Sequence, residues 1–315
     1  MSLIDTKTPM RWELSSPAKL NLSLRVISRR DDTYHNLCSL FAFCGWYDWL
    51  VLDQLDGQNT IACHVDGPQA PINLSPGENL AVRAYDFACK HFGDLPAIRL
   101  QLTKNIPNGA GLGGGSSNAA AILRWALEFH QRSLPSASSK LVNSIRTELG
   151  ADVYPILEGQ ARLWTGTGDH PGPILSLKSP LYVLVVFPND HVATSSIFSA
   201  LDDYDPPVEP DDCLWQEALS GPNSLQAPAQ SQSTAIKKLL QSMEKACQTT
   251  FDQQDDALKV QMTGSGSACF ALFWSKERAR EAAQHPELVR LPHYAGPLLT
   301  SAWQQPRPLA KILEN

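Results

Sequence analysis

Apolar and polar residues alternate over several short stretches of the chain, and this spacing predicts β-strands with one buried face. Residues 97–103 give the clearest case, because every second position there is apolar. Residues 12–27 predict a strand, a tight loop and a second strand, whereas 37–55 predict a short helix or strand followed by a strand. Further strands are predicted at residues 60–65, in a hairpin over 158–168, in the continuous apolar run 181–187, and at 269–274.

Apolar residues recur at three- and four-residue intervals elsewhere, which predicts helices that bury one face. The stretches with this spacing are residues 79–92, 119–130, 141–149, 235–249 and 277–283. Residues 202–233 are rich in Pro, Ser, Gln and Asp and predict an exposed loop. The chain beyond residue 291 has no readable pattern, and no long internal repeat is visible.

A glycine-rich stretch separates the predicted strand 97–103 from the predicted helix 119–130. Its sequence is IPNGAGLGGGSSN, residues 106–118, and five of these residues are glycine. Glycine costs backbone entropy, so such a cluster requires a reason, and close approach of backbone N–H groups to a phosphate is one. Ser116, Ser117 or Asn118 is the predicted N-cap of the following helix. The loop is therefore expected to lead into a helix N-terminus, which favours an anion.

Other glycine-rich loops fit this stretch less well. A flexible linker has polar neighbours on both sides, whereas this loop joins two apolar elements. Gly109, Gly111 and Gly114 match the dinucleotide fingerprint, but the helix runs into a loop where that fold needs a second strand. No lysine follows the glycines as in a Walker A loop, and the catalytic-loop and Asp-Phe-Gly motifs of protein kinases are absent from the sequence.

Composition limits the class of protein. With 315 residues the chain is long enough for two domains, and a net charge of −6 argues against nucleic acid or an anionic membrane as the main partner. The longest apolar run is too short to span a bilayer. Seven scattered cysteines without a Cys-x-x-Cys pair predict free thiols in a reducing compartment. A cytoplasmic enzyme acting on a small molecule, monomeric or weakly dimeric, is expected.

Several polar residues lie in patterns that suggest chemistry. Lys19 and Asn21 are two residues apart, so on a strand both point to one face. Asp152 directly follows a predicted helix end and precedes an apolar segment. Tyr34 and His35 form an aromatic pair after a charged turn. From these residues alone a solvated strand face, a helix N-cap and a structural histidine are alternative interpretations that remain open.

Taken together, the motifs closely resemble those of the GHMP kinases, named for galactose, homoserine, mevalonate and phosphomevalonate. The resemblance rests on the glycine loop, on PAKLNL at residues 17–22, on GADV at 150–153 and on TGSG at 263–266. It implies an α+β, two-domain fold, with an N-terminal ribosomal-protein-S5-like α/β domain at 1–160 and a C-terminal ferredoxin-like domain at 161–315. It also implies ATP and Mg²⁺ as cofactors, with no metal-ligating residue assigned.

The resemblance further implies a site composed of two groups. Catalysis falls to Lys19 and Asp152. ATP phosphates are held by the glycine loop, that is, by Pro107, Asn108, Gly109, Ala110, Gly111, Leu112, Gly113, Gly114, Gly115, Ser116 and Ser117. A hydroxyl of Ser116 or Ser117 is expected near Mg²⁺, with water and phosphate oxygens supplying most of its ligands.

Two further segments resemble one branch of these kinases. RRDDTYHNL, residues 29–37, and TSSIF, residues 194–198, are similar to segments that read a cytosine in that branch. The implied reaction is ATP-dependent phosphorylation of the 2-hydroxyl of a cytidine diphosphate-linked methylerythritol, for non-mevalonate isoprenoid synthesis. The substrate would be bound by Asn21, Tyr34, His35, Thr194, Phe198, Gly264, Ser265 and Gly266.

The sequence departs from that branch at three places. Thr33 stands where a glycine is usual, Tyr154 precedes Pro155 where the branch continues with Pro-Phe, and NSLQ at 223–226 replaces Asn-Asp-Leu-Glu. Another GHMP small-molecule kinase of the mevalonate, homoserine or sugar type is one alternative. A non-catalytic GHMP-fold nucleotide-binding protein is another, although Lys19 and Asp152 argue against it.

Overall fold

The computed structural model describes residues 10–32, 34–71, 75–207, 214–248 and 257–303. Within these ranges the strands form one mixed sheet. They are β1 (Arg11–Arg29), β2 (His35–Gln58), β3 (Ile61–Asp66), β4 (Pro96–Thr103), β5 (Arg162–Gly166), β6 (His170–Ile174), β7 (Tyr182–Val186), β8 (Lys259–Met262), β9 (Cys269–Phe273) and β10 (His293–Leu299). The order is β3-β4-β2-β10-β7-β9-β8, with β1 and β5 also paired to β2 and β6 paired to β5.

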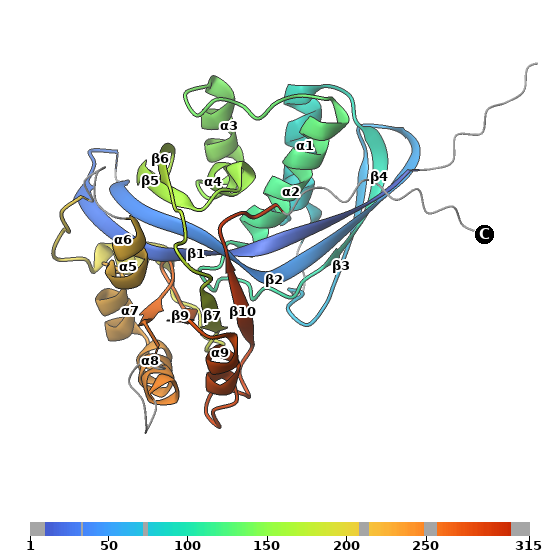
Figure 1. The fold of residues 1–315 in the computed structure, drawn as a ribbon. Coiled ribbons are helices and arrows are strands. Elements are labelled where there is room, and N and C mark those ends of the chain that lie inside the picture. The colour runs from blue at the N-terminus through green and yellow to red at the C-terminus, as the bar shows by residue number, and fades with distance from the viewer. Residues whose placement is uncertain (1–9, 33, 72–74, 208–213, 249–256, 304–315) are drawn as a thin grey trace, which may run out of the picture.

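The long antiparallel pair β1–β2 runs through the whole molecule (Figure 1). Both strands are continuous, so the predicted tight loop within residues 12–27 and the helix considered within 37–55 are wrong. Ala18, Leu20 and Leu22 are fully buried, and this burial favours strand along the full length. Register shifts absorb the irregular positions, one of them between Pro17 and Ala18, where a strand tolerates the missing N–H of proline.

Four helices cover one face of the N-terminal half of the sheet: α1 (Leu80–Phe92), α2 (Gly114–Phe129), α3 (Lys140–Leu149) and α4 (Val153–Glu158) (Figure 1). A short 3₁₀ helix, η1 (Pro76–Glu78), precedes α1. The apolar faces of these helices pack on β2 and β4, with Tyr85, Trp125 and Trp164 among the largest buried side chains. The helices predicted at 79–92 and 141–149 are confirmed.

The second half places β7, β8, β9 and β10 against α8 (Thr234–Cys247) and α9 (Lys276–Ala283) (Figure 1). Helix α5 (Thr194–Ser199) follows β7, and α6 (Leu214–Ser220) and α7 (Gln226–Gln232) follow α5. The prediction of an exposed loop over 202–233 is therefore wrong for most of its described part. Trp215, Leu225 and Ala229 are buried there, so a few apolar residues in a polar stretch are enough to dock two helices.

Strand β10 was not predicted, yet it joins the two halves of the sheet. It pairs with β7 through His293–Pro297 and with β2 at Leu298 and Leu299. Strands β5 and β6 lie after residue 160 and also extend the sheet along β2. The division of the chain into domains at residue 160 remains a prediction. Among the described residues, no helix is long and apolar enough to cross a membrane.

Lys259 is a charged group buried between the two halves. Its Nζ donates to the backbone oxygens of Leu22 (2.6 Å), Gly221 (2.6 Å) and Ala218 (3.3 Å), which links β8 to β1 and to the end of α6. Burial lowers the pKa of Lys259 from 10.5 to about 7, and the nearby carboxylate of Glu217 opposes this shift. The folded protein therefore loses this proton at a much lower pH than the unfolded chain.

We expect this lysine to make stability depend on pH. Between pH 7 and 10.5 the unfolded chain binds one more proton at Lys259 than the folded chain. The free energy of unfolding of the wild type should therefore rise with pH relative to that of Lys259→Met, by up to about 1.4 kcal/mol per pH unit. Urea unfolding of both proteins at a series of pH values measures this difference. A difference that stays flat from neutral to alkaline pH would contradict the expectation.

Candidate active site

The glycine-rich loop bends over the start of α2 in a conformation that only glycine adopts readily. Gly109, Gly111 and Gly113 have φ of +64°, +75° and +64°. Gly113 is the N-cap of α2, so the helix begins at Gly114, and the predicted cap at Ser116, Ser117 or Asn118 is wrong. The left-handed Gly113 allows the helix to start one turn early, and Ser117 N bonds to Gly113 O at 2.8 Å. The last glycines of the loop thus provide the free N–H groups of the helix N-terminus.

The loop is held by contacts with three other segments. A Cβ on Gly111 would lie 2.7 Å from Thr263 O, one on Gly113 would lie 2.7 Å from Lys19 Cγ, and one on Gly109 would lie 2.6 Å from His191 Nδ1. Main-chain bonds from Lys19 N to Leu112 O (2.9 Å) and from Ala268 N to Ala110 O (3.0 Å) fix its position. The structure therefore brings together the predicted phosphate loop, β1 and the Gly264–Gly266 turn.

Lys19 is the centre of the polar contacts next to this loop. Its Nζ lies 3.2 Å from Asp152 Oδ2 and donates to Asn21 Oδ1 at 2.7 Å. The same ammonium lies 5.0 Å from the centre of the Phe41 ring. Lys19 and Asn21 point to one face of β1, as predicted, and both are buried. The side chain of Asp152 is 37% exposed, so the ion pair has one buried member and one accessible member.

Asp152 precedes α4 but does not cap it. It occupies the N-cap position, and its side chain forms no capping hydrogen bond. Its carboxylate instead faces Lys19 and remains accessible for a further partner. Tyr154 is buried, edge-to-face with Trp164 at 5.9 Å between ring centres. The departure from the family pattern at Tyr154 therefore lies in the helical core of the N-terminal half.

The predicted cytosine-reading residues come from two distant segments that meet. The His35 ring stacks on Phe198 of α5 with 4.7 Å between centres and 28° between planes. Tyr34 is 62% exposed, and Thr33 lies outside the described residues. Burial, and secondarily the charge of Arg29, lower the pKa of His35. Thr194 Oγ1 lies 2.8 Å from Ser265 Oγ, which connects α5 to the Gly264–Gly266 turn.

Two sets of residues that support the site were not predicted to be site residues. Asn223 donates from Nδ2 to Met262 O (2.8 Å) and Gly264 O (2.9 Å), and so holds the turn in place. Lys104 and Asp48 form an ion pair at the base of the glycine loop, with 4% and 0% of their side chains exposed. Asp48 Oδ1 also accepts from the backbone N–H groups of residues 105 and 106. Asn223 could have been found from the sequence, because it is the first residue of the NSLQ segment. No sequence pattern near Lys104 or Asp48 indicates that these two residues form a pair.

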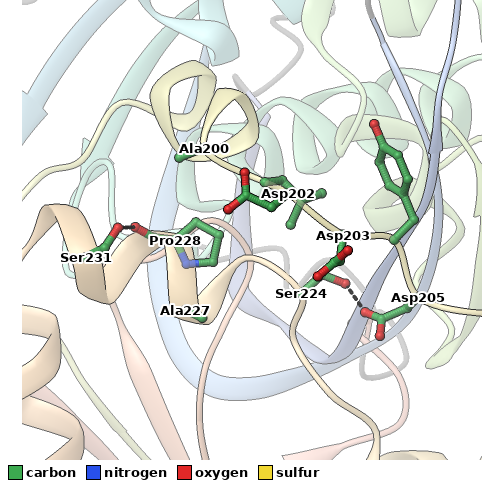
Figure 2. A pocket seen from close by; sticks show the side chains of 10 residues that line it. Ala200, Asp202, Asp203, Asp205, Ser224, Ala227, Pro228 and Ser231 are labelled. Carbon is green, nitrogen blue, oxygen red and sulfur yellow. Dashed lines mark hydrogen bonds between the residues drawn. The ribbon is translucent and has the colours of Figure 1, made fainter.

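A pocket of about 440 Å³ lies between residues 200–205 and α7 (Figure 2). Asp202, Asp203 and Asp205 line it, and Ser224 Oγ donates to Asp205. Carboxylates disfavour an anionic ligand, so this pocket is unsuited to nucleotide phosphates. The glycine loop, which presents N–H groups and neighbours Lys19, is suited to them.

The residues present fit ATP better than they fit a protein-bound metal. The positive-φ glycines leave no Cβ between the backbone and an anion, and α2 contributes its N-terminus. Among the described residues, no group of three or more His, Cys, Asp or Glu side chains could hold a metal ion. A Mg²⁺ ion here would take most of its ligands from phosphate oxygens and water.

Comparison with known protein families agrees with this geometry. Residues 79–160 match the GHMP kinases N terminal domain, and residues 215–285 match the GHMP kinases C terminal domain. A crystal structure of homoserine kinase from Cytophaga hutchinsonii superposes with a TM-score of 0.59 at 15% identity, covering 96% of this chain and 98% of that one. The two matched segments and the fold therefore indicate an α+β, two-domain GHMP kinase.

Proteins with higher sequence identity show which branch of the GHMP kinases the chain belongs to. The 4-diphosphocytidyl-2-C-methyl-D-erythritol kinase of Rhodopirellula baltica is 32% identical, over 88% of this chain and 92% of its own length. A crystal structure of 4-(cytidine 5'-diphospho)-2C-methyl-D-erythritol kinase superposes with a TM-score of 0.73 at 32% identity, covering 91% of this chain and 99% of that one. The chain belongs to the 4-diphosphocytidyl-2-C-methyl-D-erythritol kinase family of the GHMP kinases.

Proposed function

We propose that this protein transfers the γ-phosphoryl group of ATP to the 2-hydroxyl of 4-diphosphocytidyl-2-C-methyl-D-erythritol, a step of non-mevalonate isoprenoid precursor synthesis. The observation that carries the proposal is the Lys19–Asp152 ion pair, which lies directly beside a glycine loop at a helix N-terminus. Membership of the family whose members are named for this reaction supports the choice of substrate.

Phosphoryl transfer requires positioning and charge neutralisation more than covalent help from the protein. In the proposed mechanism the accessible carboxylate of Asp152 accepts the proton of the substrate hydroxyl. The Lys19 ammonium keeps that carboxylate ionised and favours the developing alkoxide. Asn21, which already accepts from Lys19, orients the substrate. The glycine loop holds the β- and γ-phosphates, and Mg²⁺ neutralises their charge when bound.

Ser116 and Ser117 are the residues proposed to lie near Mg²⁺. Ser117 Oγ is buried and has no hydrogen-bond partner, so it is an unsatisfied polar group in the first turn of α2. The Gly264–Gly266 turn is proposed to close the site over the substrate phosphates, since it packs on Gly111 and contacts Thr194 through Ser265. Cytoplasmic location and a monomeric or weakly dimeric state remain predictions from the composition.

Acceptor choice is assigned to residues that have no role in phosphoryl transfer. Tyr34 and Phe198 are proposed to stack on the cytosine, and His35 to pair with its polar edge. A base between two rings needs a contact distance of about 3.5 Å on each of its faces, so it does not fit between His35 and Phe198 while their centres are 4.7 Å apart. Substrate binding must therefore separate these two rings or use the other face of Phe198.

This assignment predicts that substrate and ATP respond differently to mutation. Phe198→Ala should raise KM for the cytidyl substrate by about 5- to 150-fold, because stacking is worth about 1–3 kcal/mol per base. His35→Ala should also raise this KM, because the hydrogen bond to the polar edge of the base is lost. KM for ATP should stay within about twofold. Free CMP should compete with the substrate but not with ATP. Equal KM changes for both ligands, or competition of CMP with ATP alone, would remove these residues from the substrate site.

A coupled ADP-release assay over a panel of acceptors tests the proposed function. The purified protein with ATP and Mg²⁺ should release ADP with 4-diphosphocytidyl-2-C-methyl-D-erythritol, and not with mevalonate, homoserine or galactose. Turnover of one of the other acceptors would make the protein a different GHMP kinase. A nucleotide-dependent thermal shift without ADP release from any acceptor would indicate a nucleotide-binding protein without turnover.

A further inference from the structure

Ser39 lies on β2, next to β1, the strand that carries Lys19 and Asn21. It is 3% exposed and lies opposite Leu24 in the β1–β2 pair. Its Oγ donates to Ser23 O at 2.7 Å and accepts from Asn21 Nδ2 at 2.7 Å. Both partners belong to β1, next to the register shift between Asn21 and Ser23. The hydroxyl of Ser39 therefore connects the irregular part of β1 to the side chain of Asn21.

This pair of bonds determines which way the Asn21 amide faces. A serine hydroxyl has one hydrogen, and a carbonyl oxygen can only accept, so the hydrogen of Ser39 is committed to Ser23 O. Asn21 must then donate to Ser39 through its NH₂ group. Its oxygen Oδ1 is left on the other side, 2.7 Å from Lys19 Nζ. The Lys19 ammonium thus has one neutral acceptor in Asn21 and one charged partner, Asp152, at 3.2 Å.

We propose that Ser39 is a positioning residue for phosphoryl transfer, which acts by fixing the orientation of the Asn21 amide and thereby the place of the Lys19 ammonium beside Asp152. This inference rests on the proposed function of the site. Without the Ser39 hydroxyl the Nδ2 group of Asn21 loses its acceptor, so the amide is held only by its bond to Lys19 and can rotate away from this position. Lys19 would lose an acceptor and its alignment with Asp152.

Loss of this alignment should appear in the chemical step more than in binding. Ser39→Ala is expected to lower kcat about tenfold, the scale of one misplaced hydrogen bond, and to change KM for either substrate by less than about threefold. Ser39→Thr keeps the hydroxyl and should retain kcat within about twofold. Ser39→Val has the shape of threonine without the hydroxyl and should behave like Ser39→Ala. The Thr and Val pair separates the hydroxyl from packing.

The β1–β2 pair contains a matched control. Ser28 Oγ on β1 accepts from Asn36 Nδ2 on β2 at 2.9 Å, the same kind of cross-strand bond without a link to Lys19. Ser28→Ala should leave kcat within about twofold of the wild type. Thermal unfolding of each variant shows how much folded protein the assay contains, so that kcat is expressed per folded molecule.

A double-mutant cycle with Asn21→Ala gives the deciding measurement. If Ser39 acts through Asn21, adding Ser39→Ala to Asn21→Ala should change kcat by less than about twofold. An equal loss in both backgrounds would mean that Ser39 acts independently, and would overturn the inference. Wild-type kcat in Ser39→Val would also overturn it. Absence of turnover in the wild type would overturn the proposed function itself. The two failures are distinguishable, because the wild type is assayed before any variant is compared with it.

Discussion

Replacing Asp152 by asparagine is expected to lower kcat by about 10²-fold or more, the scale of a lost general base, while ATP still binds. Asparagine has the size of aspartate but cannot take the proton of the substrate hydroxyl. The carboxylate lies 3.2 Å from Lys19 Nζ and forms no capping hydrogen bond to α4. The substitution therefore removes no capping bond from this helix. Steady-state kinetics and calorimetric titration with ATP–Mg²⁺ measure the two effects separately.

Asp53→Asn is the matched control for this change. Asp53 pairs with Arg11 at 3.3 Å on the surface of the β1–β2 pair, and such exposed pairs are worth about 0–1 kcal/mol. The same substitution there should leave turnover unchanged. Near-wild-type turnover in folded Asp152→Asn would remove this residue from catalysis, and the whole assignment of the Lys19–Asp152 pair with it.

A valine at Gly113 is expected to abolish measurable ATP binding while the protein still unfolds cooperatively. Gly113 has φ of +64°, which a β-branched residue rarely adopts. Its Cβ would also lie 2.7 Å from Lys19 Cγ and 3.1 Å from Lys19 Cε, so the loop or the lysine must move. Both movements disturb the backbone that should approach the phosphates. Titration calorimetry with ATP–Mg²⁺ and a thermal unfolding curve provide the two readouts.

Gly168→Ala separates backbone strain from the contact with Lys19. Gly168 has φ of +89° in the turn between β5 and β6, and nothing lies within 4 Å of its added Cβ. This variant should lose some stability and keep its affinity for ATP. Unchanged ATP affinity in folded Gly113→Val would mean that the glycine loop does not hold the nucleotide phosphates.

The local pattern of apolar and polar residues was sufficient to predict the strands and helices whose buried face is encoded in their own sequence. The strand predicted at residues 97–103 and the helix predicted at 235–249 correspond to β4 (Pro96–Thr103) and α8 (Thr234–Cys247). The two-residue spacing of Lys19 and Asn21 correctly placed both on one face, because the side-chain period of a strand is fixed. The order of the motifs, read through the family resemblance, indicated which loops would meet at one site.

Elements that depend on distant partners could not be predicted. Strand β10 contains Gly296 and Pro297, which weaken its strand signal, and it forms because β2 and β7 pair with it. The early start of α2 depends on the left-handed Gly113 lying against Lys19. Ser39, Asn223 and the Lys104–Asp48 pair act through contacts between segments far apart in the chain, which no local spacing reveals.

We propose that this site moves a phosphoryl group from ATP to the 2-hydroxyl of a cytidine diphosphate-linked methylerythritol. Phosphorus NMR of the reaction of the purified protein with ATP, Mg²⁺ and 4-diphosphocytidyl-2-C-methyl-D-erythritol tests it most directly. We expect one new phosphomonoester for each ADP formed, with the substrate diphosphate intact and the new phosphate coupled to carbon 2 of the polyol. Release of ADP with inorganic phosphate alone, or a phosphomonoester at another hydroxyl, would contradict it.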